Sequence, residues 1–351
     1  MPNTPHANSI ERLTAIWQRV LQRPDVTPSS NFFDLGGDPQ KVYQLIDEIV
    51  RIFGRPVPVL RLCQAPTITE LAKFLEAAEP PPIPPVMQLM GGIGRPPVFI
   101  MHGLGGSVLE FMQLVRLVDV PNPFYGFQAK GADGSEEPLD RVEDMAQYHL
   151  EALRHVQPQG PYFLLGFSLG GLVVYEMARQ LDSNGERVSL LVLIESYPDL
   201  TRVSLRQRLR VRARVAKYHA NSMLRMPFPK AISYLIHPDE RQRCDSSQCK
   251  EKNGVAPPEL SAIAPGMPRV REAALLALQR YQPPLYGGPV KFVKAATSLY
   301  FPDNPRAFWA PLVDRFDEET VPGDHLGILN VHFAELATVL SRYLRAADAI
   351  Q

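Results

Sequence analysis

A proline-rich segment divides this chain, because neither a helix nor a central strand continues through it. Residues 79–97 read EPPPIPPVMQLMGGIGRPP and hold seven of the 35 prolines in the chain of 351 residues. Proline breaks helices, and its fixed φ favours extended chain. The sequence therefore predicts a small unit at 1–78, a semi-rigid linker at 79–97 and a large unit at 98–351.

Charge and cysteine content narrow the classes of function. Lys and Arg number 37, as do Asp and Glu, so the formal net charge is zero and gives no case for nucleic acid or anionic membrane as a partner. We find neither an apolar run long enough to span a membrane nor a signal peptide. Cys63, Cys244 and Cys249 are too few for a disulfide framework. We expect a reduced, cytoplasmic protein with no metal site.

The small unit has the pattern of a helical bundle. Apolar residues recur at helical spacing over 9–23, 40–53 and 68–77. The loop between the first two helices reads Asn-Phe-Phe-Asp-Leu-Gly-Gly-Asp over 31–38. With a helix after it, this loop resembles the phosphopantetheine-attachment loop of acyl and peptidyl carrier domains, and the resemblance covers roughly residues 8–78. It implies a small all-α carrier-like domain.

One residue departs from that family. The residue after Gly-Gly-Asp is the serine that carries the prosthetic arm in carrier domains, and here it is Pro39. Proline has no hydroxyl for the phosphodiester, although it suits the first turn of a helix. Ser29 and Ser30 precede the motif and are poor substitutes. We expect no covalently bound cofactor, and interpret the unit either as a degenerate carrier kept for docking or as an evolutionary remnant.

The large unit alternates short apolar runs with helical patterns. Buried strands are expected at 98–103, 124–129, 162–167, 189–196 and 290–295, and helices at 143–156 and 171–185. Such alternation predicts an α/β fold, a parallel sheet with helices on both faces.

The strongest motif of the large unit lies where an expected strand meets an expected helix. Gly166-Phe167-Ser168-Leu169-Gly170-Gly171 has the G-x-S-x-G pattern of a nucleophile elbow, in which a sharp turn exposes the serine hydroxyl above the sheet. Ser168 is the candidate nucleophile. His325, in Gly-Asp-His-Leu-Gly near the C-terminus, is the candidate base. His332, in the final helical pattern, is its rival, and His102 is expected to be structural.

The sequence leaves more than one candidate for the acid and for the second oxyanion donor. Glu195 follows the strand after Ser168 and is the favoured acid, with Asp303 as the alternative and Asp199 as a third option. An oxyanion needs two backbone N–H groups, and we expect them from Leu169, the residue after the nucleophile, and Leu104. Gly103 is the alternative to Leu104.

Taken together, these motifs resemble the thioesterase domains of nonribosomal peptide and polyketide synthases. HGLGG, YGFQAKG, GFSLGG, the ES pair after the next strand and GDHLGIL carry the likeness over about 95–346. It implies an α/β-hydrolase fold with a helical lid, here about 197–285. It also implies transfer of an acyl, aminoacyl or peptidyl chain from a carrier's pantetheine thiol to serine. The family's acid is usually aspartate, so Glu195 departs from the pattern.

The resemblance leaves several functions open. We expect a thioesterase of secondary-metabolite biosynthesis that releases its chain by hydrolysis, and the alternatives are transfer to an amine or hydroxyl, cyclisation, or a non-catalytic docking adaptor. Since Pro39 offers no attachment point, the acyl thioester should come in trans from a separate carrier or synthase module. The position at which the chain begins suggests a free-standing didomain.

One segment of the expected lid is strongly basic. Seven cations lie within 16 residues: Arg202, Arg206, Arg208, Arg210, Arg212, Arg214 and Lys217. The segment is interpreted either as a solvated amphipathic helix with Leu205, Leu209 and Val215 turned inward, or as a surface that recognises a carrier.

Overall fold

The structure, a computed structural model, describes residues 5–55, 57, 61–62, 65–77, 83–199, 204–224 and 266–349. Cys63, Cys244 and Cys249 lie outside the described residues, as does the part of the expected lid at 225–265. Within the described ranges, no helix is long and apolar enough to cross a membrane.

The small unit is the expected helical bundle. Its helices are α1 (Pro5–Leu21), α2 (Pro39–Phe53) and α4 (Ile68–Glu76). They enclose one apolar core in which the rings of Trp17 and Phe32 meet edge to face at 5.0 Å. α4 begins with a capping box, since Thr67 and Glu70 each accept the other's backbone N–H, and this fixes where the helix starts.

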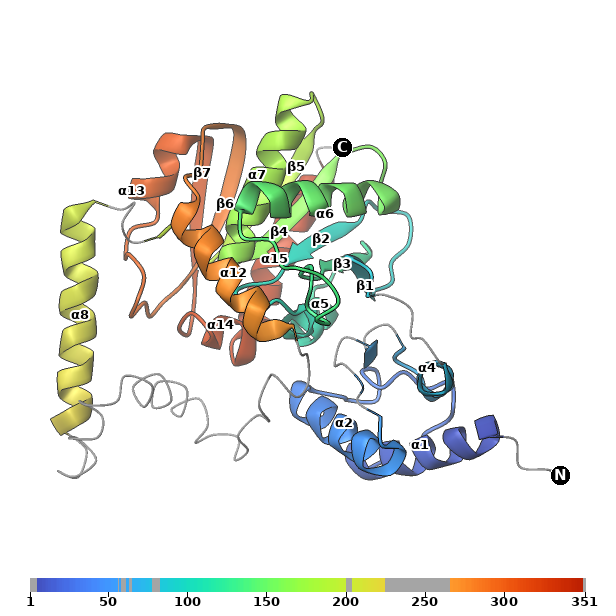
Figure 1. The fold of residues 1–351 in the computed structure, drawn as a ribbon. Helices are drawn as coiled ribbons and strands as arrows, with labels where there is room; N and C mark the ends of the chain where they lie inside the picture. Colours follow the sequence, from blue (N-terminus) through green and yellow to red (C-terminus); the bar gives the residue numbers. More distant parts are fainter. Residues whose placement is uncertain are drawn as a thin grey trace.

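The large unit is a seven-stranded sheet covered by helices on both faces (Figure 1). The strand order is β1-β3-β2-β4-β5-β6-β7, and the strands are β1 (Val86–Met90), β2 (Val98–Met101), β3 (Phe124–Phe127), β4 (Tyr162–Phe167), β5 (Val188–Ile194), β6 (Tyr286–Ala295) and β7 (Val313–Val321). β2 to β7 run parallel, and only β1 is antiparallel to its neighbour. The expected α/β fold is confirmed.

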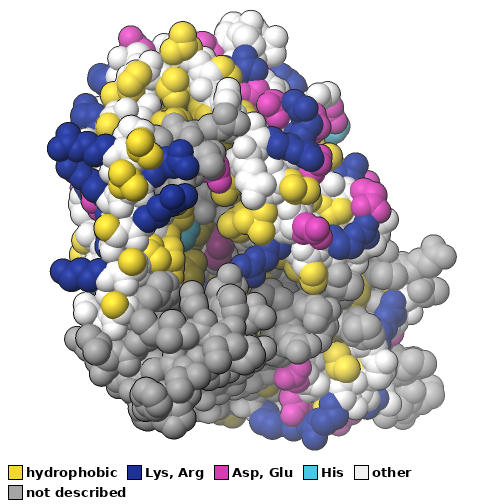
Figure 2. Space-filling view, turned by 60° about the vertical axis from the view of Figure 1, so that its left-hand side comes forward, with side chains coloured by type: hydrophobic (Ala, Val, Ile, Leu, Met, Phe, Trp, Pro, Cys, Tyr) yellow, Lys and Arg dark blue, Asp and Glu magenta, His cyan; other side chains and the backbone are white. Residues whose placement is uncertain are grey.

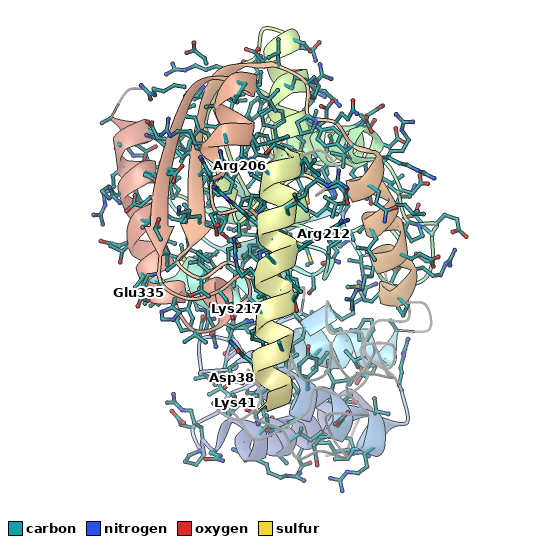
Figure 3. The ribbon with its side chains drawn as sticks, turned by 90° about the vertical axis from the view of Figure 1, so that its left-hand side faces the viewer. Asp38, Lys41, Arg206, Arg212, Lys217 and Glu335 are labelled. Atoms are coloured by element: carbon teal, nitrogen blue, oxygen red, sulfur yellow. The ribbon has the colours of Figure 1, made fainter. Side chains whose placement is uncertain are left out.

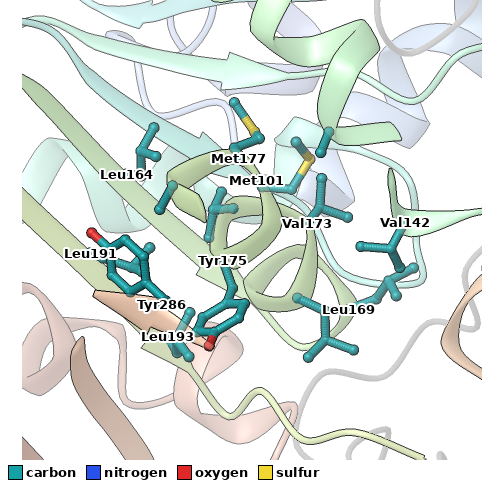
Figure 4. Packing of buried hydrophobic residues seen from close by; sticks show 14 of the residues in the cluster. Met101, Val142, Leu164, Leu169, Val173, Tyr175, Met177, Leu191, Leu193 and Tyr286 are labelled. Atoms are coloured by element: carbon teal, nitrogen blue, oxygen red, sulfur yellow. The ribbon is translucent and has the colours of Figure 1, made fainter. Parts of the chain in front are cut away.

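The helices divide between the two faces of the sheet. The remaining helices are α5 (Met112–Leu117), α6 (Val142–Val156), α7 (Leu169–Ser183), α8 (Leu205–Leu224), α12 (Met267–Arg280), α13 (Arg306–Trp309), α14 (Gly327–Asn330) and α15 (Phe333–Asp348), with short 3-10 helices at Val108–Phe111 and Ala310–Leu312. Residues of α6, α7 and α12 share one apolar core with the sheet, and residues of α5 and α15 share the other. Figure 4 shows α7 side chains such as Val173 and Met177 in the first of these cores.

Two strands were not expected. Residues 86–90 belong to the expected linker, yet they form β1, which pairs antiparallel with β3, and Met87 is buried. The proline-free stretch VMQLM supplies an edge strand, so the linker at 79–97 is shorter than we predicted. β7, VDRFDEETV, lacks the apolar pattern of a buried strand, because charged residues separate its buried positions, Phe316 and Val321. Such a pattern is typical of a sheet edge with one face in water.

The two units contact each other through α5. Arg116 donates to the carbonyl of Phe33 and pairs with Asp34, with 2.8 Å between Nη2 and Oδ1. Met112, also in α5, is buried in the apolar core of the small unit. The loop that precedes Pro39 is thus held against the large unit.

Candidate active site

The chain turns sharply at Ser168, between the end of β4 and the start of α7. Ser168 has φ 54° and ψ −121°, a conformation that costs on the order of 1–3 kcal/mol for a side chain with a Cβ. Neighbouring groups hold it there: its N–H donates to the Ile194 carbonyl at 2.9 Å, and the Ser196 hydroxyl donates to the Ser168 carbonyl at 2.7 Å. This is the geometry of a nucleophile elbow.

Glycines make the turn possible by allowing backbone to approach backbone. A Cβ on Gly170 would lie 2.2 Å from the His102 carbonyl oxygen, and a Cβ on Gly166 would lie 2.3 Å from the Gly170 carbonyl oxygen. Both distances are far inside van der Waals contact, so only glycine fits at these two positions.

His325 lies directly beside the elbow. Its Nε2 is 3.1 Å from the Ser168 Oγ, and its Nδ1 is 3.2 Å from the Glu195 Oε2. The imidazole lies between the rings of Phe167 and Phe301, with centroids at 4.9 Å and 4.5 Å. Both rings therefore pack against the imidazole.

Glu195 is fully buried at the carboxyl end of β5. Its φ of 47° turns the side chain toward His325. The other carboxylate oxygen, Oε1, accepts the Ala295 N–H at 2.7 Å and the Tyr197 hydroxyl at 3.3 Å. Burial, and then the nearby carboxylate of Glu195, raise the pKa of Tyr197, so the phenol stays protonated and donates. Both oxygens of Glu195 therefore have donors, which compensates for burying a charge.

The alternative acid lies elsewhere. Asp303 is 64% exposed and pairs with Arg214 of α8, with 2.6 Å between Oδ2 and Nη2. Asp199 lies four residues beyond Glu195 in the loop after β5. The structure thus brings Ser168, His325 and Glu195 together and leaves Asp303 in a surface ion pair.

The other two histidines considered above, His332 and His102, contact different partners. His332 precedes α15, and its Nδ1 is 3.3 Å from the Glu335 carboxylate. His102 is buried, its Nδ1 is 2.8 Å from the Gly103 carbonyl, and burial lowers its pKa to about 4. Because that carbonyl can only accept, Nδ1 carries the proton, and His102 is neutral near pH 7.

The expected oxyanion donors lie on either side of the serine. Leu169 is the first residue of α7, so its N–H has no acceptor within the helix and lies at the positive end of the helix dipole. A Cβ on Gly103 would lie 3.3 Å from the Ser168 Cβ, which places the 102–106 loop beside the hydroxyl. The Gly103 N–H, however, donates to the Glu110 Oε1 at 2.8 Å.

Glu110 was not singled out from the sequence, because a lone glutamate outside any motif gives no signal. It lies in the 3-10 helix Val108–Phe111. Its carboxylate anchors the 102–106 loop through Gly103, and burial raises its pKa to about 7. Glu110 is therefore a positioning residue for the loop that carries Leu104.

Replacing Glu110 by glutamine should change how stability depends on pH. Because the folded pKa, about 7, lies above the ordinary 4.5, the unfolded chain ionises first as the pH rises. The wild type should therefore lose free energy of unfolding relative to Glu110→Gln between about pH 4.5 and 7. Urea unfolding at pH 5 and pH 7.5 measures this difference. A wild type that gained stability relative to the variant over this range would contradict it.

A mostly apolar pocket of about 30 Å³ adjoins the elbow. The end of β2, the loop after it, α6, α7 and α12 line it, including His102, Gly103, Met145, Leu169, Val173 and Ala274. Among the residues that the structure describes, no group of three or more His, Cys, Asp or Glu side chains is arranged to hold a metal ion.

The basic helix differs in part from its expected orientation. In α8, Leu205 and Leu209 are 67% and 55% exposed, so the expectation that they turn inward was wrong. Val211 is buried instead, and Arg214 reaches the carbonyls of Ser298 and Phe301. The contacts of these two residues set which face of the helix turns inward.

The loop before α2 leads into a capped helix, but residue 39 offers no hydroxyl. Asp38 caps α2 by accepting the Lys41 N–H at 2.8 Å, and Pro39 is the first residue of the helix. The nearby hydroxyls of Ser29 and Ser30 hydrogen-bond with the Thr27 hydroxyl. The residues present therefore do not fit a phosphopantetheine ester at position 39.

The fold and the site define the class of protein. The sheet is mostly parallel and has helices on both faces. A serine lies at the elbow after a central strand, and a histidine and a buried carboxylate reach it from later loops. These features characterise an α/β-hydrolase.

Comparison with known families identifies the two units. Residues 96–225 match the thioesterase domain family, and residues 11–75 match the phosphopantetheine attachment site family. The chain therefore consists of a carrier-like domain followed by a thioesterase domain, as the two resemblances predicted.

Two related synthases are much longer than this chain. A dimodular nonribosomal peptide synthase of Bacillus subtilis (strain 168) is 38% identical over 56% of this chain, and an indigoidine synthase of Dickeya dadantii (strain 3937) is 32% identical over 70%. This chain spans 8% and 16% of their respective lengths.

Solved structures share the fold. A four-domain nonribosomal peptide synthetase, holo-AB3403 bound to AMP and glycine, matches 97% of this chain and 26% of its own at 24% identity, with a TM-score of 0.57. The NocB thioesterase domain, in a covalent complex with a fluorophosphonate nocardicin G analogue, matches 74% of this chain and 99% of its own at 23% identity, with a TM-score of 0.51.

Proposed function

We propose that this protein is a serine thioesterase that releases an acyl, aminoacyl or peptidyl chain from a pantetheine thioester. The observation that carries the proposal is the hydrogen-bonded chain from Ser168 through His325 to the buried Glu195. The thioesterase family match and the synthase relatives support the thioester as substrate and biosynthesis of a secondary metabolite as the setting.

The proposed reaction proceeds through an acyl-serine. The Oγ of Ser168 attacks the thioester carbonyl while the Nε2 of His325 takes the hydroxyl proton. The C–S bond then breaks, and His325 gives that proton to the leaving thiol. Water repeats the attack on the ester, again with His325 as base, and Ser168 regains its proton as the free acid leaves. Glu195 holds the Nδ1–H of His325 and stabilises the imidazolium.

Two backbone N–H groups would stabilise the negative carbonyl oxygen in each step. Leu169 is the first, from the start of α7. Since Gly103 donates to Glu110, Leu104 is the donor that we propose from the opposite loop. Loss of one such donor typically costs about 3 kcal/mol of transition-state stabilisation.

The thioester should come from a carrier other than residues 11–75. Pro39 offers no hydroxyl, so we infer that this chain binds no phosphopantetheine covalently and acts in trans on its substrate. Treatment with a phosphopantetheinyl transferase and coenzyme A should leave the intact mass unchanged. The same treatment of the Pro39→Ser variant tests whether the loop can be modified once residue 39 carries a hydroxyl. A gain of one phosphopantetheine by the wild type would contradict the inference.

The acceptor decides between hydrolysis and transfer. We expect free acid as the main product from a panel of acyl and aminoacyl pantetheine thioesters. Adding amines or alcohols to the same assay tests the alternative, because a transferase or cyclase would form amide or ester in place of acid. If no thioester reacts, the protein is a docking adaptor and the proposal fails.

A further inference from the structure

We propose that the outward face of α8 docks the acidic surface of the carrier that delivers the acyl chain, an inference that rests on the proposed function. Figure 1 shows α8 at the outer edge of the thioesterase domain, and Figure 3 shows Arg206, Arg212 and Lys217 along its length. No activity assigned above uses these side chains.

The outward face of α8 combines positive charge with exposed apolar area. The helix has five arginines and one lysine and no acidic residue. At 100° per residue, Arg206, Arg210 and Lys217 lie within about 40° of one another around the axis. Leu205, Leu209 and Arg212 form a second exposed stripe beside them. We call these six residues the α8 outer face.

The cations of this outer face are available to a partner. Arg206, Arg210, Arg212 and Lys217 are exposed and form no ion pair within the part of the chain that the structure describes. Figure 2 shows Lys and Arg side chains gathered on this side of the molecule, with apolar side chains between them. Apolar area with charge around it is typical of a protein interface, where charges guide encounter and apolar contacts add affinity.

The inward face of the same helix leads directly to the catalytic histidine proposed above. Arg214 pairs with Asp303 and donates to the Phe301 carbonyl, and the Phe301 ring lies 4.5 Å from the His325 ring. A partner bound to the α8 outer face would therefore lie beside the site at which the thioester must arrive. This location favours the carrier over an anionic membrane as the partner.

The length over which Arg206, Arg210 and Lys217 are spread favours an acidic protein surface, and not a single phosphate, as the binding partner. Lys217 lies eleven positions after Arg206, which is about 16 Å of helix. One phosphodiester can contact only part of that length, whereas acidic side chains spread over a domain surface can pair with all of it. Docking should therefore not require the prosthetic arm.

The test compares a carrier-bound with a carrier-free substrate. The variant is Arg206→Gln/Arg210→Gln/Lys217→Gln, and the matched control removes three exposed cations elsewhere, Lys73→Gln/Arg95→Gln/Arg187→Gln. The probes are an acyl pantetheine thioester and the same acyl group on an acidic holo peptidyl carrier domain, with binding of the apo carrier domain measured separately by fluorescence anisotropy.

We expect the α8 variant to raise KM for the acyl-carrier, and Kd for the apo carrier, about tenfold at low salt, with kcat unchanged. Turnover of the acyl pantetheine should stay within about twofold in all three proteins. Added salt should weaken carrier binding by the wild type and bring it toward the variant.

Other results would contradict either the docking proposal or the proposed function. Equal KM and Kd for the wild type and the α8 variant would overturn the docking proposal, as would equal losses in the α8 variant and the control. Loss of binding to phosphatidylglycerol vesicles in the variant, with carrier binding intact, would assign the helix to membranes instead. No turnover of any thioester by the wild type would overturn the proposed function, while the apo-carrier measurement still decides the docking.

Discussion

Ser168→Ala is expected to abolish thioester turnover and the acyl-enzyme together. Without the hydroxyl, no ester can form, and only binding and the oxyanion donors remain to assist direct attack by water. Removing a nucleophilic serine from such a unit costs roughly 10⁶-fold in kcat. Turnover of an acyl pantetheine thioester by the wild type and the variant measures the loss, with added wild type as a standard to detect contamination.

A control serine distinguishes loss of the nucleophile from general damage to α7. Ser183 closes the same helix, and its hydroxyl only donates to the Gln180 carbonyl, so Ser183→Ala should retain full activity within about twofold. The Ser168→Ala protein should also unfold at the wild-type urea concentration or above it, since alanine removes no buried group. Retention of more than a few per cent of activity in Ser168→Ala would contradict the nucleophile assignment.

Glu195→Gln should reduce turnover by about 10⁴-fold, with little change in the fold. The amide can still accept the Ala295 N–H, but its NH₂ then faces the Nδ1 of His325. That contact favours the tautomer with the proton on Nε2, which cannot accept the Ser168 proton. Steady-state kinetics at pH 7.5 measures the effect.

The matched control is Asp303→Asn, at the other carboxylate that follows a strand of the sheet. Asp303 pairs with Arg214 at the surface, so we expect a change of no more than about threefold. A loss at Asp303 as large as the loss at Glu195 would reverse the assignment of the acid. The turnover of Glu195→Asp should lie between those of Glu195→Gln and Asp303→Asn, because the shorter side chain keeps the charge but holds it farther from His325.

Ser168 was predictable because its signal is local. The glycines around it, the preceding apolar strand and the following helix all lie within about 20 residues, and the structure shows why glycine is needed at 166 and 170. His325 was predicted from its place in Gly-Asp-His-Leu-Gly beyond the last strand that the sequence indicated, although β7, which directly precedes it, was not expected. Both predictions depended on the order of elements, and the alternation of strands and helices gave that order.

The sequence favoured Glu195 over Asp303 as the acid, but it could not place either carboxylate beside His325. Each carboxylate follows a strand at the same edge of the sheet, and the distance of each to His325 depends on how the loops fold. In the structure, Arg214 of α8 holds Asp303 at the surface, while a φ of 47° turns Glu195 inward. An ion pair between residues 89 positions apart leaves no pattern in a single sequence.

The failures of sequence reasoning follow from tertiary contacts. Helical periodicity showed that α8 is a helix but misjudged its inward face, which Val211 and Arg214 determine through contacts with the body of the domain. β1 was hidden among prolines, because pairing with β3 rather than strand propensity forms it. Glu110 acts through one hydrogen bond to the Gly103 backbone, and no motif marks it.

The most direct test of the account is an intact-mass measurement on the protein mixed with acyl and aminoacyl pantetheine thioesters, with no carrier added. We expect an added acyl mass on the wild type that fragmentation places on Ser168, or free acid where hydrolysis is fast, and neither with Ser168→Ala. An adduct at another residue, the same behaviour in both proteins, or no reaction with any thioester would contradict it.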